Sequence, residues 1–192
     1  MGGPLPRRHP EVGGDSLIFT PTAVAGAFLV DLERREDERG FFARLWDREE
    51  LEGRGLEPGL AQSSLSFNRR RGTLRGMHYQ AAPHEEVKLV RCTRGAVWDV
   101  VLDLRRDSAS FRRHFGVALS EDNRRSVYVP RGCAHGFLTL TDGAEVVYLI
   151  SEFHRPPAAR GVRWDDPTFA IEWPEEPQVI SPRDRSWPEF TG

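Results

Sequence analysis

Apolar and polar residues alternate over many short stretches of this chain, the pattern of strands with one buried face. Between residues 96 and 104, the even-numbered positions from Trp98 to Leu104 point one way and the odd-numbered positions from Val97 to Asp103 point the other. Further strands are predicted over residues 17–20, 27–32, 41–46, 113–120, 126–129, 136–140 and 145–151. Many short strands separated by turn residues predict an all-β sandwich or barrel.

Helix signals are sparse by comparison. Asp47 is positioned to cap a short helix that ends at about Gly55, where glycine terminates it. After residue 155 the chain is rich in proline, and we expect irregular chain packed on the sheet surface. Three tryptophans are available for that packing: Trp164, Trp173 and Trp187.

Length and composition narrow the class of protein. The chain of 192 residues fits one domain, which we place at residues 16–192, after a glycine- and proline-rich segment, residues 1–15, expected to be disordered. A net charge of −2 argues against a nucleic-acid partner. No secretory leader and no apolar run of the ~20 residues that a membrane span needs are visible. We therefore expect a cytoplasmic protein without a membrane partner.

Two residue types stand out by their scarcity. Lys88 is the only lysine among 27 basic residues, which marks a position favouring a compact ammonium or reflects arginine-rich codon usage. The two cysteines, Cys92 and Cys133, have no metal-type spacing, and we expect core or loop thiols and no disulfide.

Two stretches follow the spacing of the cupin pattern, which belongs to a double-stranded jelly roll. The first runs from Gly72 through His78 to Gly95, and the second is the Pro-Arg-Gly-Cys-Ala-His run ending at His135. The second histidine of the cupin metal site is replaced by Gln80, and its glutamate by Lys88. An ammonium has no lone pair for a metal and repels one. We therefore expect a cupin cup with a fixed cation, and neither a metal nor another cofactor.

This cup resembles that of the nucleotide-sugar 3,5-epimerases, the dTDP-4-dehydrorhamnose 3,5-epimerase family. The pair Leu-Arg-Gly-Met-His-Tyr-Gln, residues 74–80, and Lys-Leu-Val-Arg, residues 88–91, is specific to it. Supporting stretches lie at residues 37–42, 99–105, 129–137 and 181–184. The resemblance implies a cupin double-stranded β-helix (jelly roll) with short peripheral helices. It also implies a cofactor-independent epimerase of a nucleoside-diphosphate 4-keto-6-deoxy sugar, an isomerase of carbohydrate biosynthesis.

Such an epimerase needs a base that removes the proton alpha to the C4 ketone, and His78 suits this task near neutral pH. The resemblance assigns Asp184 as the carboxylate that orients the histidine. Lys88 is suited to stabilise the enolate oxygen. Tyr148 matches the family's acid, since a neutral phenol can return a proton from the opposite face.

The resemblance also implies a set of substrate contacts. Arg39 and Arg75 match positions that contact the sugar diphosphate, a task that suits guanidinium groups. Gln62 and Phe42 match positions near the nucleotide, and His135 matches a second pocket histidine. Family members are homodimers that exchange N-terminal strands, so the Arg39 region is expected to reach the partner's site.

Three departures from the family pattern leave the exact substrate open. His154 stands where the family usually has a second tyrosine, close to the sugar, and Arg44 stands where many members have a glutamate that contacts the base. Ser63 and Ser64 replace an Asp-Asn pair that follows the glutamine. Alternatives are a 3- or 5-mono-epimerase or a keto-isomerase of an antibiotic-sugar pathway, and, in a different class, a non-catalytic or metal-binding cupin.

Overall fold

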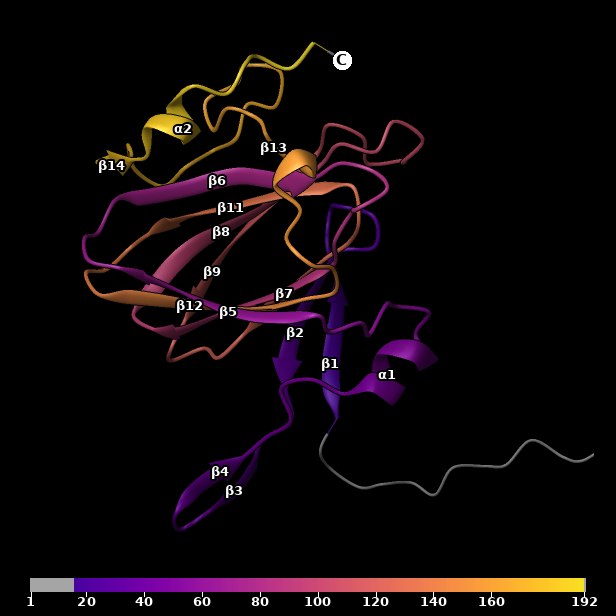
Figure 1. The fold of residues 1–192 in the computed structure, drawn as a ribbon. Coiled ribbons are helices and arrows are strands. Elements are labelled where there is room, and N and C mark those ends of the chain that lie inside the picture. Colours follow the sequence, from indigo (N-terminus) through magenta and orange to yellow (C-terminus); the bar gives the residue numbers. More distant parts are fainter. Residues whose placement is uncertain (1–15, 192) are drawn as a thin grey trace, which may run out of the picture.

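The computed structural model describes residues 16–191, and most of its strands form two sheets packed face to face (Figure 1). The first sheet has the order β1-β2-β10-β7-β12-β5. Its strands are β1 (Leu17–Pro21), β2 (Phe28–Leu32), β10 (Ser126–Val129), β7 (Lys88–Arg94), β12 (Ala144–Ile150) and β5 (Gln62–Asn68). The expected disorder of residues 1–15 lies outside the described residues.

The second sheet has the order β13-β6-β11-β8-β9. Its strands are β13 (Ala159–Gly161), β6 (Thr73–Gln80), β11 (Cys133–Thr139), β8 (Ala96–Asp103) and β9 (His114–Ser120), and β14 (Val179–Ile180) pairs with β6 in parallel. From β5 to β8 and again from β9 to β13, successive strands alternate between the sheets, as expected for a jelly roll. The predicted all-β jelly roll is confirmed.

The main hydrophobic core lies between the two sheets, because each sheet turns one face of its alternating strands inward. The odd-numbered side chains of β8 contribute to it, with Val97 and Val101 fully or almost fully buried. Val90 of β7 and Val146 of β12 meet them from the first sheet. The inward face of β8 also carries Asp99, which is 1% exposed.

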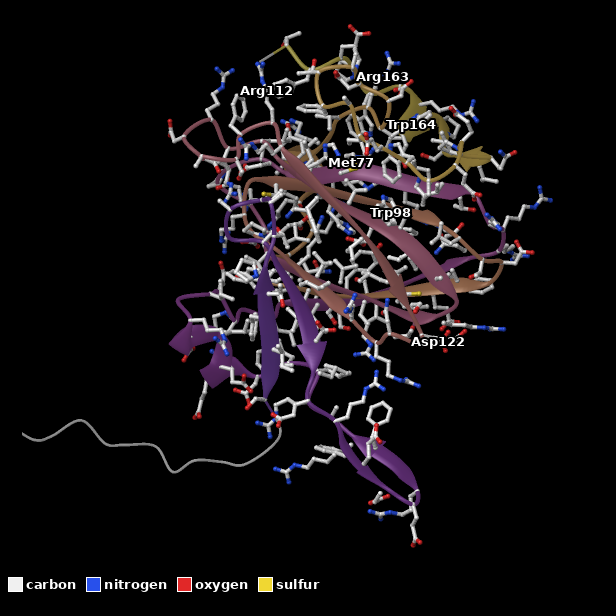
Figure 2. All side chains as sticks on the ribbon, turned by 180° about the vertical axis from the view of Figure 1, so that it is seen from behind. Met77, Trp98, Arg112, Asp122, Arg163 and Trp164 are labelled. Carbon is white, nitrogen blue, oxygen red and sulfur yellow. The ribbon has the colours of Figure 1, made fainter. Side chains whose placement is uncertain are left out.

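Two further layers cover the outer faces. Helix α1 (Arg48–Gly53) begins at Asp47, whose side chain accepts a hydrogen bond from the backbone N–H of Glu50 at 3.0 Å, as the sequence predicts. On the second sheet, residues 155–191 form the short helix η1 (Pro156–Ala158), strands β13 and β14, and α2 (Pro182–Arg185). Met77 packs under this segment (Figure 2). The segment is therefore more regular than expected, because β6 offers an edge with which β13 and β14 pair.

A two-stranded hairpin stands apart from the sandwich (Figure 1). It consists of β3 (Arg35–Asp37) and β4 (Gly40–Phe42), and every residue of both strands is exposed. The strand expected over residues 41–46 ends at Phe42, and Arg44 instead pairs with Asp47 at the start of α1, at 2.8 Å.

The turn between β10 and β11 sets the position of one pocket histidine. Gly132 has φ of +74°, and a Cβ there would lie 2.6 Å from Cγ of Arg105, so a glycine is required. The turn leads directly into β11, where His135 lies opposite His78 of β6 in the strand register. The two histidines of the cupin pattern are thus brought together by one strand pair.

Candidate active site

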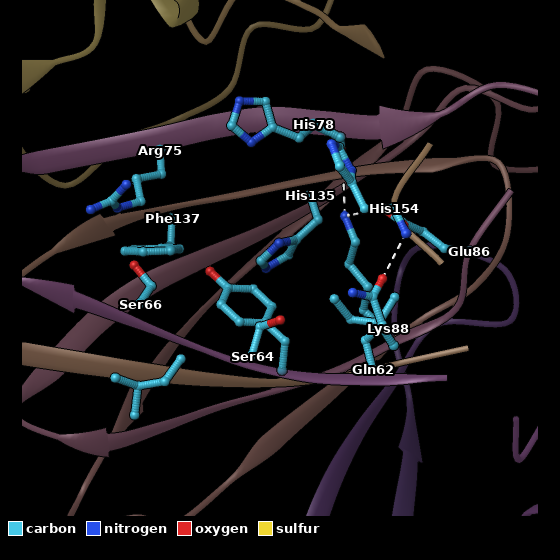
Figure 3. A pocket seen from close by; sticks show the side chains of 13 residues that line it. Gln62, Ser64, Ser66, Arg75, His78, Glu86, Lys88, His135, Phe137 and His154 are labelled. Carbon is cyan, nitrogen blue, oxygen red and sulfur yellow. Dashed lines mark hydrogen bonds and ion pairs between the residues drawn. The ribbon is translucent and has the colours of Figure 1, made fainter. Parts of the chain in front are cut away.

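A hollow of about 370 Å³ opens between the two sheets and collects most of the predicted site residues (Figure 3). β6 contributes Arg75 and His78, and β7 contributes Lys88. The remaining predicted residues in its lining are Gln62 of β5, His135 of β11, Tyr148 of β12 and His154. Residues from distant parts of the sequence therefore converge, because neighbouring strands of a jelly roll are remote in sequence.

His78 forms a pair with Asp184 at the rim of this hollow. Its Nε2 lies 2.6 Å from Oδ1 of Asp184, and the carboxylate is almost completely buried while the ring is 42% exposed. Asp184 belongs to α2, and its backbone N–H is held by the hydroxyl of Ser181 at the helix start. Because Nε2 faces the carboxylate as a donor, Nδ1 is the ring nitrogen with a free lone pair.

The environment of Asp184 favours its ionised form. Burial alone raises the pKa of this carboxyl, but the hydrogen bond from His78 and its charge more than offset that effect. The backbone N–H of Gly76, 3.4 Å from Oδ2, and the indole of Trp187 add to the lowering. The pKa of Asp184 therefore lies below its usual value, and the carboxylate can hold the imidazole in one orientation.

Lys88 is held in the floor of the hollow by an acidic neighbour. Its Nζ lies 2.8 Å from Oε1 of Glu86, and the two side chains are only 10% and 12% exposed. The ammonium also lies 3.5 Å from the backbone carbonyl oxygen of His78. A fixed cation thus lies beside the strand that carries the histidine. Glu86 escaped the sequence analysis, although it stands two residues before Lys88.

Tyr148 lies deep in the same hollow, beside His135. The ring centroids of the two residues are 6.0 Å apart, in an edge-to-face arrangement. Burial raises the pKa of Tyr148 well above its usual value, and the charge of Asp99 adds to the rise while Arg75 opposes it. The phenol is therefore protonated at neutral pH and can donate.

His135 is fixed by a partner that the sequence analysis left without a role. Its Nε2 lies 2.8 Å from Oδ2 of Asp99, and both side chains are buried. Asp103, on the same face of β8, instead binds Arg105. The alternation along β8 was the available signal, since it points Asp99 into the core, where a carboxylate needs a partner.

Three predicted substrate contacts lie outside the hollow. Arg39 is at the tip of the β3–β4 hairpin, with its side chain 84% exposed and paired with Asp37. Phe42 of the same hairpin is 64% exposed, and Arg44 is paired with Asp47 near α1. The single chain therefore does not bring these residues to His78.

Within the described part of the chain, residues 16–191, no three histidine, cysteine or acidic side chains are grouped to hold a metal ion. Gln80, at the position of a cupin metal ligand, uses its amide to bind backbone: it donates to the carbonyl of His84 and accepts from the N–H of Arg155. Over the same residues, no helix is both long enough and apolar enough to cross a membrane.

A jelly roll whose cup holds a histidine–aspartate pair, a buried ammonium and a protonated phenol belongs to the class of enzymes that move protons at carbon. Residues 21–192 match the family model of dTDP-4-dehydrorhamnose 3,5-epimerase. The chain belongs to this family, and it is an epimerase, that is, an isomerase.

Relatives cover nearly the whole chain. The dTDP-4-dehydrorhamnose 3,5-epimerase of Methanothermobacter thermautotrophicus is 40% identical over 172 residues, which are 88% of this chain and 92% of the relative. The dTDP-4-dehydrorhamnose 3-epimerase of Streptomyces niveus is 40% identical over 86% of this chain and 80% of its own length. The crystal structure of the Bacillus anthracis 3,5-epimerase with TDP and pyrophosphate bound has a TM-score of 0.87 at 35% identity, covering 91% of this chain and all of that one.

Proposed function

We propose that this epimerase acts on dTDP-4-dehydro-6-deoxyglucose or a close relative, by cofactor-independent removal of a proton alpha to the C4 ketone. The observation that carries the proposal is the His78–Asp184 pair, with Nε2 2.6 Å from Oδ1, at the rim of a hollow large enough for a hexose. Nδ1 of His78 takes the proton from C3 or C5, and Asp184 stabilises the imidazolium that forms.

Lys88 and Tyr148 complete the reaction. As the proton leaves, negative charge develops on the C4 oxygen, and the buried ammonium of Lys88 stabilises it. Tyr148 then delivers a proton to the opposite face of the same carbon, so the configuration inverts. The raised pKa of the buried phenol supports this order, because it keeps the proton on Tyr148 until the carbanion is present to accept it.

The remaining residues of the hollow hold the substrate. Arg75, whose Nε binds Oδ1 of Asn68 at 2.7 Å, presents its guanidinium group to the diphosphate. His135 and His154 contact the sugar. Gln62 lies toward the nucleotide and also accepts the backbone N–H of His154 at 2.6 Å, so it positions that residue.

We further propose a homodimer in which the β3–β4 hairpin of each chain, with Arg39 and Phe42, closes the hollow of the other. Two observations support it. The hairpin projects from its own sandwich, and Phe42 at its base is 64% exposed (Figure 1). The outer face of β5 also exposes Leu65 and Phe67, at 60% and 46%, next to one another on the strand.

We propose that the protein is located in the cytoplasm, in keeping with two buried cysteines that are both free.

A second candidate is inversion at one carbon only. His154 lines the hollow where a tyrosine is usual in the family, and a shorter, basic side chain there changes how the ring is held for the second deprotonation. A keto-isomerase would use the same base and enolate but move the carbonyl.

The deciding experiment is solvent exchange. The protein is incubated with dTDP-4-dehydro-6-deoxyglucose in D2O and the sugar is followed by proton NMR. Deuterium at C3 and C5 with inverted configuration is the expected result. Label at a single carbon identifies the mono-epimerase, and a shifted carbonyl the isomerase. Complete absence of exchange with this nucleotide sugar would overturn the proposed substrate.

A further inference from the structure

Trp187, four residues from the C-terminal end of the described chain, reaches the His78–Asp184 pair from outside the hollow. Its indole N–H donates to Oδ1 of Asp184 at 3.4 Å, the same oxygen that binds His78. Its ring meets the imidazole edge-to-face, with centroids 6.4 Å apart. The Trp187 side chain therefore contacts both members of the pair, although Trp187 is not among the residues that line the hollow.

The neighbouring strand is shaped to receive this ring. Gly161 of β13 lies directly opposite His78 in the register of β13 and β6. A Cβ at Gly161 would lie 2.3 Å from Cε2 of Trp187, closer than packing permits. The glycine thus leaves the space over the strand pair that the indole fills.

A cation also lies over the indole ring. The guanidinium carbon of Arg183, in α2, is 5.1 Å from the Trp187 ring centroid. A positive charge over the ring draws its π electrons and makes the indole N–H a better donor. Asp184, the acceptor of that N–H, is the next residue along the chain from Arg183.

We infer that Trp187 is a positioning residue for proton transfer. It fixes the orientation of the Asp184 carboxylate and weakens the attraction of that carboxylate for the protonated His78. This inference rests on the proposed function. Trp187 acts through Asp184 and does not touch the substrate. Its N–H withdraws negative charge from Oδ1, so the imidazolium form of His78 is less favoured and the neutral imidazole is present at lower pH. No proton passes through Trp187 itself.

Trp187→Phe tests this, because it keeps an aromatic ring at this position and removes the N–H together with part of the indole surface. Trp173→Phe is the matched control, since its indole N–H donates to the backbone carbonyl of Trp164 at 2.9 Å, in the same C-terminal segment. We expect Trp187→Phe to lower kcat at neutral pH roughly threefold with an unchanged KM, and to move the acid limb of kcat/KM up by about half a pH unit. Trp173→Phe should move neither.

A second readout does not need turnover. In protein with ¹⁵N-labelled histidine, the pH midpoint at which the His78 ring protonates should rise by the same increment in Trp187→Phe, about threefold in the equilibrium. Gly161→Ala keeps the indole but displaces it, and should change the midpoint in the same direction. A Trp187→Phe protein whose midpoint and pH profile match those of Trp173→Phe would overturn the inference. Absent turnover in the wild type, with the midpoint shift intact, would instead reject the proposed substrate alone.

Discussion

His135 and Asp99 form a second histidine–aspartate pair, with Nε2 2.8 Å from Oδ2, which joins the neighbouring strands β11 and β8 and lies next to His78 of β6. This pair is buried, whereas His78 of the first pair is 42% exposed at the rim. The difference in exposure separates their roles. The rim pair can exchange protons with substrate and solvent, while the buried pair fixes the wall against which Tyr148 packs.

Asp99→Asn should therefore be costly to the fold. Oδ1 of Asp99 is buried without a hydrogen-bond partner. In the asparagine variant the amide nitrogen takes that place, and its N–H groups find no acceptor there. We expect the free energy of unfolding to fall by about 1–3 kcal/mol, measured by urea denaturation. Asp107→Asn, in an exposed turn, is the control and should change it little. Equal stability of the two variants would contradict a structural role for the buried pair.

His78→Asn should remove turnover and leave binding almost intact. The amide cannot act as a base, and a general base contributes roughly 10²- to 10⁴-fold to kcat. Steady-state kinetics and calorimetric binding of dTDP measure the two effects separately. His114→Asn, on β9 and outside the hollow, serves as the control. Substantial residual turnover in His78→Asn would assign the base to another residue.

Tyr148→Phe should separate exchange from inversion. The ring still packs on His135, and His78 still removes the proton, so deuterium continues to enter from the His78 face. Without the phenol, protonation of the opposite face fails. Proton NMR in D2O should therefore show label with retained configuration, whereas Tyr128→Phe, on the outer face of the first sheet, should still invert. Equal loss of exchange and inversion would remove Tyr148 from the role of acid.

The acid stability of the fold should depend on Asp103. Burial alone raises the pKa of this carboxyl, but hydrogen bonds from Arg105, Ser108 and Ser110 outweigh burial and lower it to about 2. The folded pKa is below the unfolded one, so the unfolded state binds the proton more readily as pH falls. The carboxylate therefore contributes about 2 kcal/mol above pH 4, and this contribution is lost between about pH 4 and 2.

Asp103→Asn removes that titration. Its free energy of unfolding should change less with pH between about pH 4 and 2 than that of the wild type, measured by urea denaturation at each pH. Asp107→Asn keeps Asp103 and should follow the wild-type curve. An Asp103→Asn curve with the full wild-type slope would place the acid sensitivity elsewhere.

The alternation of apolar residues and the cupin spacing predict the sandwich and the convergence of His78, Lys88 and His135, because these patterns are local in sequence. Partnerships across the fold are less accessible. Glu86 reads as one of two adjacent acids before a strand, and only the fold shows it buried against Lys88. The pairing of β14 with β6 is likewise invisible in an irregular, proline-rich stretch, since it depends on a free strand edge far away.

Arg39 shows a different limit. The resemblance places Arg39 at the family's diphosphate contact, yet the hairpin that carries it projects away from the two sheets of its own chain (Figure 1). A sequence pattern does not show whether a loop contributes to the site of its own chain or to that of a second chain. In the proposed dimer the hairpin of one subunit supplies Arg39 to the hollow of the other, and a subunit-mixing experiment tests this arrangement.

Arg39→Ala should raise KM for the nucleotide sugar, and His78→Asn should abolish turnover, when each is made alone. Coexpressed at equal levels, the two variants should regain activity, because half of the dimers are mixed and one of their two sites has both residues intact. The expected activity is about a quarter of wild type per subunit, assayed at low substrate concentration. In the control mixture Arg160→Ala replaces Arg39→Ala, because the exposed Arg160 guanidinium donates to the backbone carbonyls of Pro157 and Ala159 in its own chain. If Arg39 acted on the hollow of its own chain, every site in a mixed dimer would carry a defect, and coexpression would restore nothing above the sum of the separate variants.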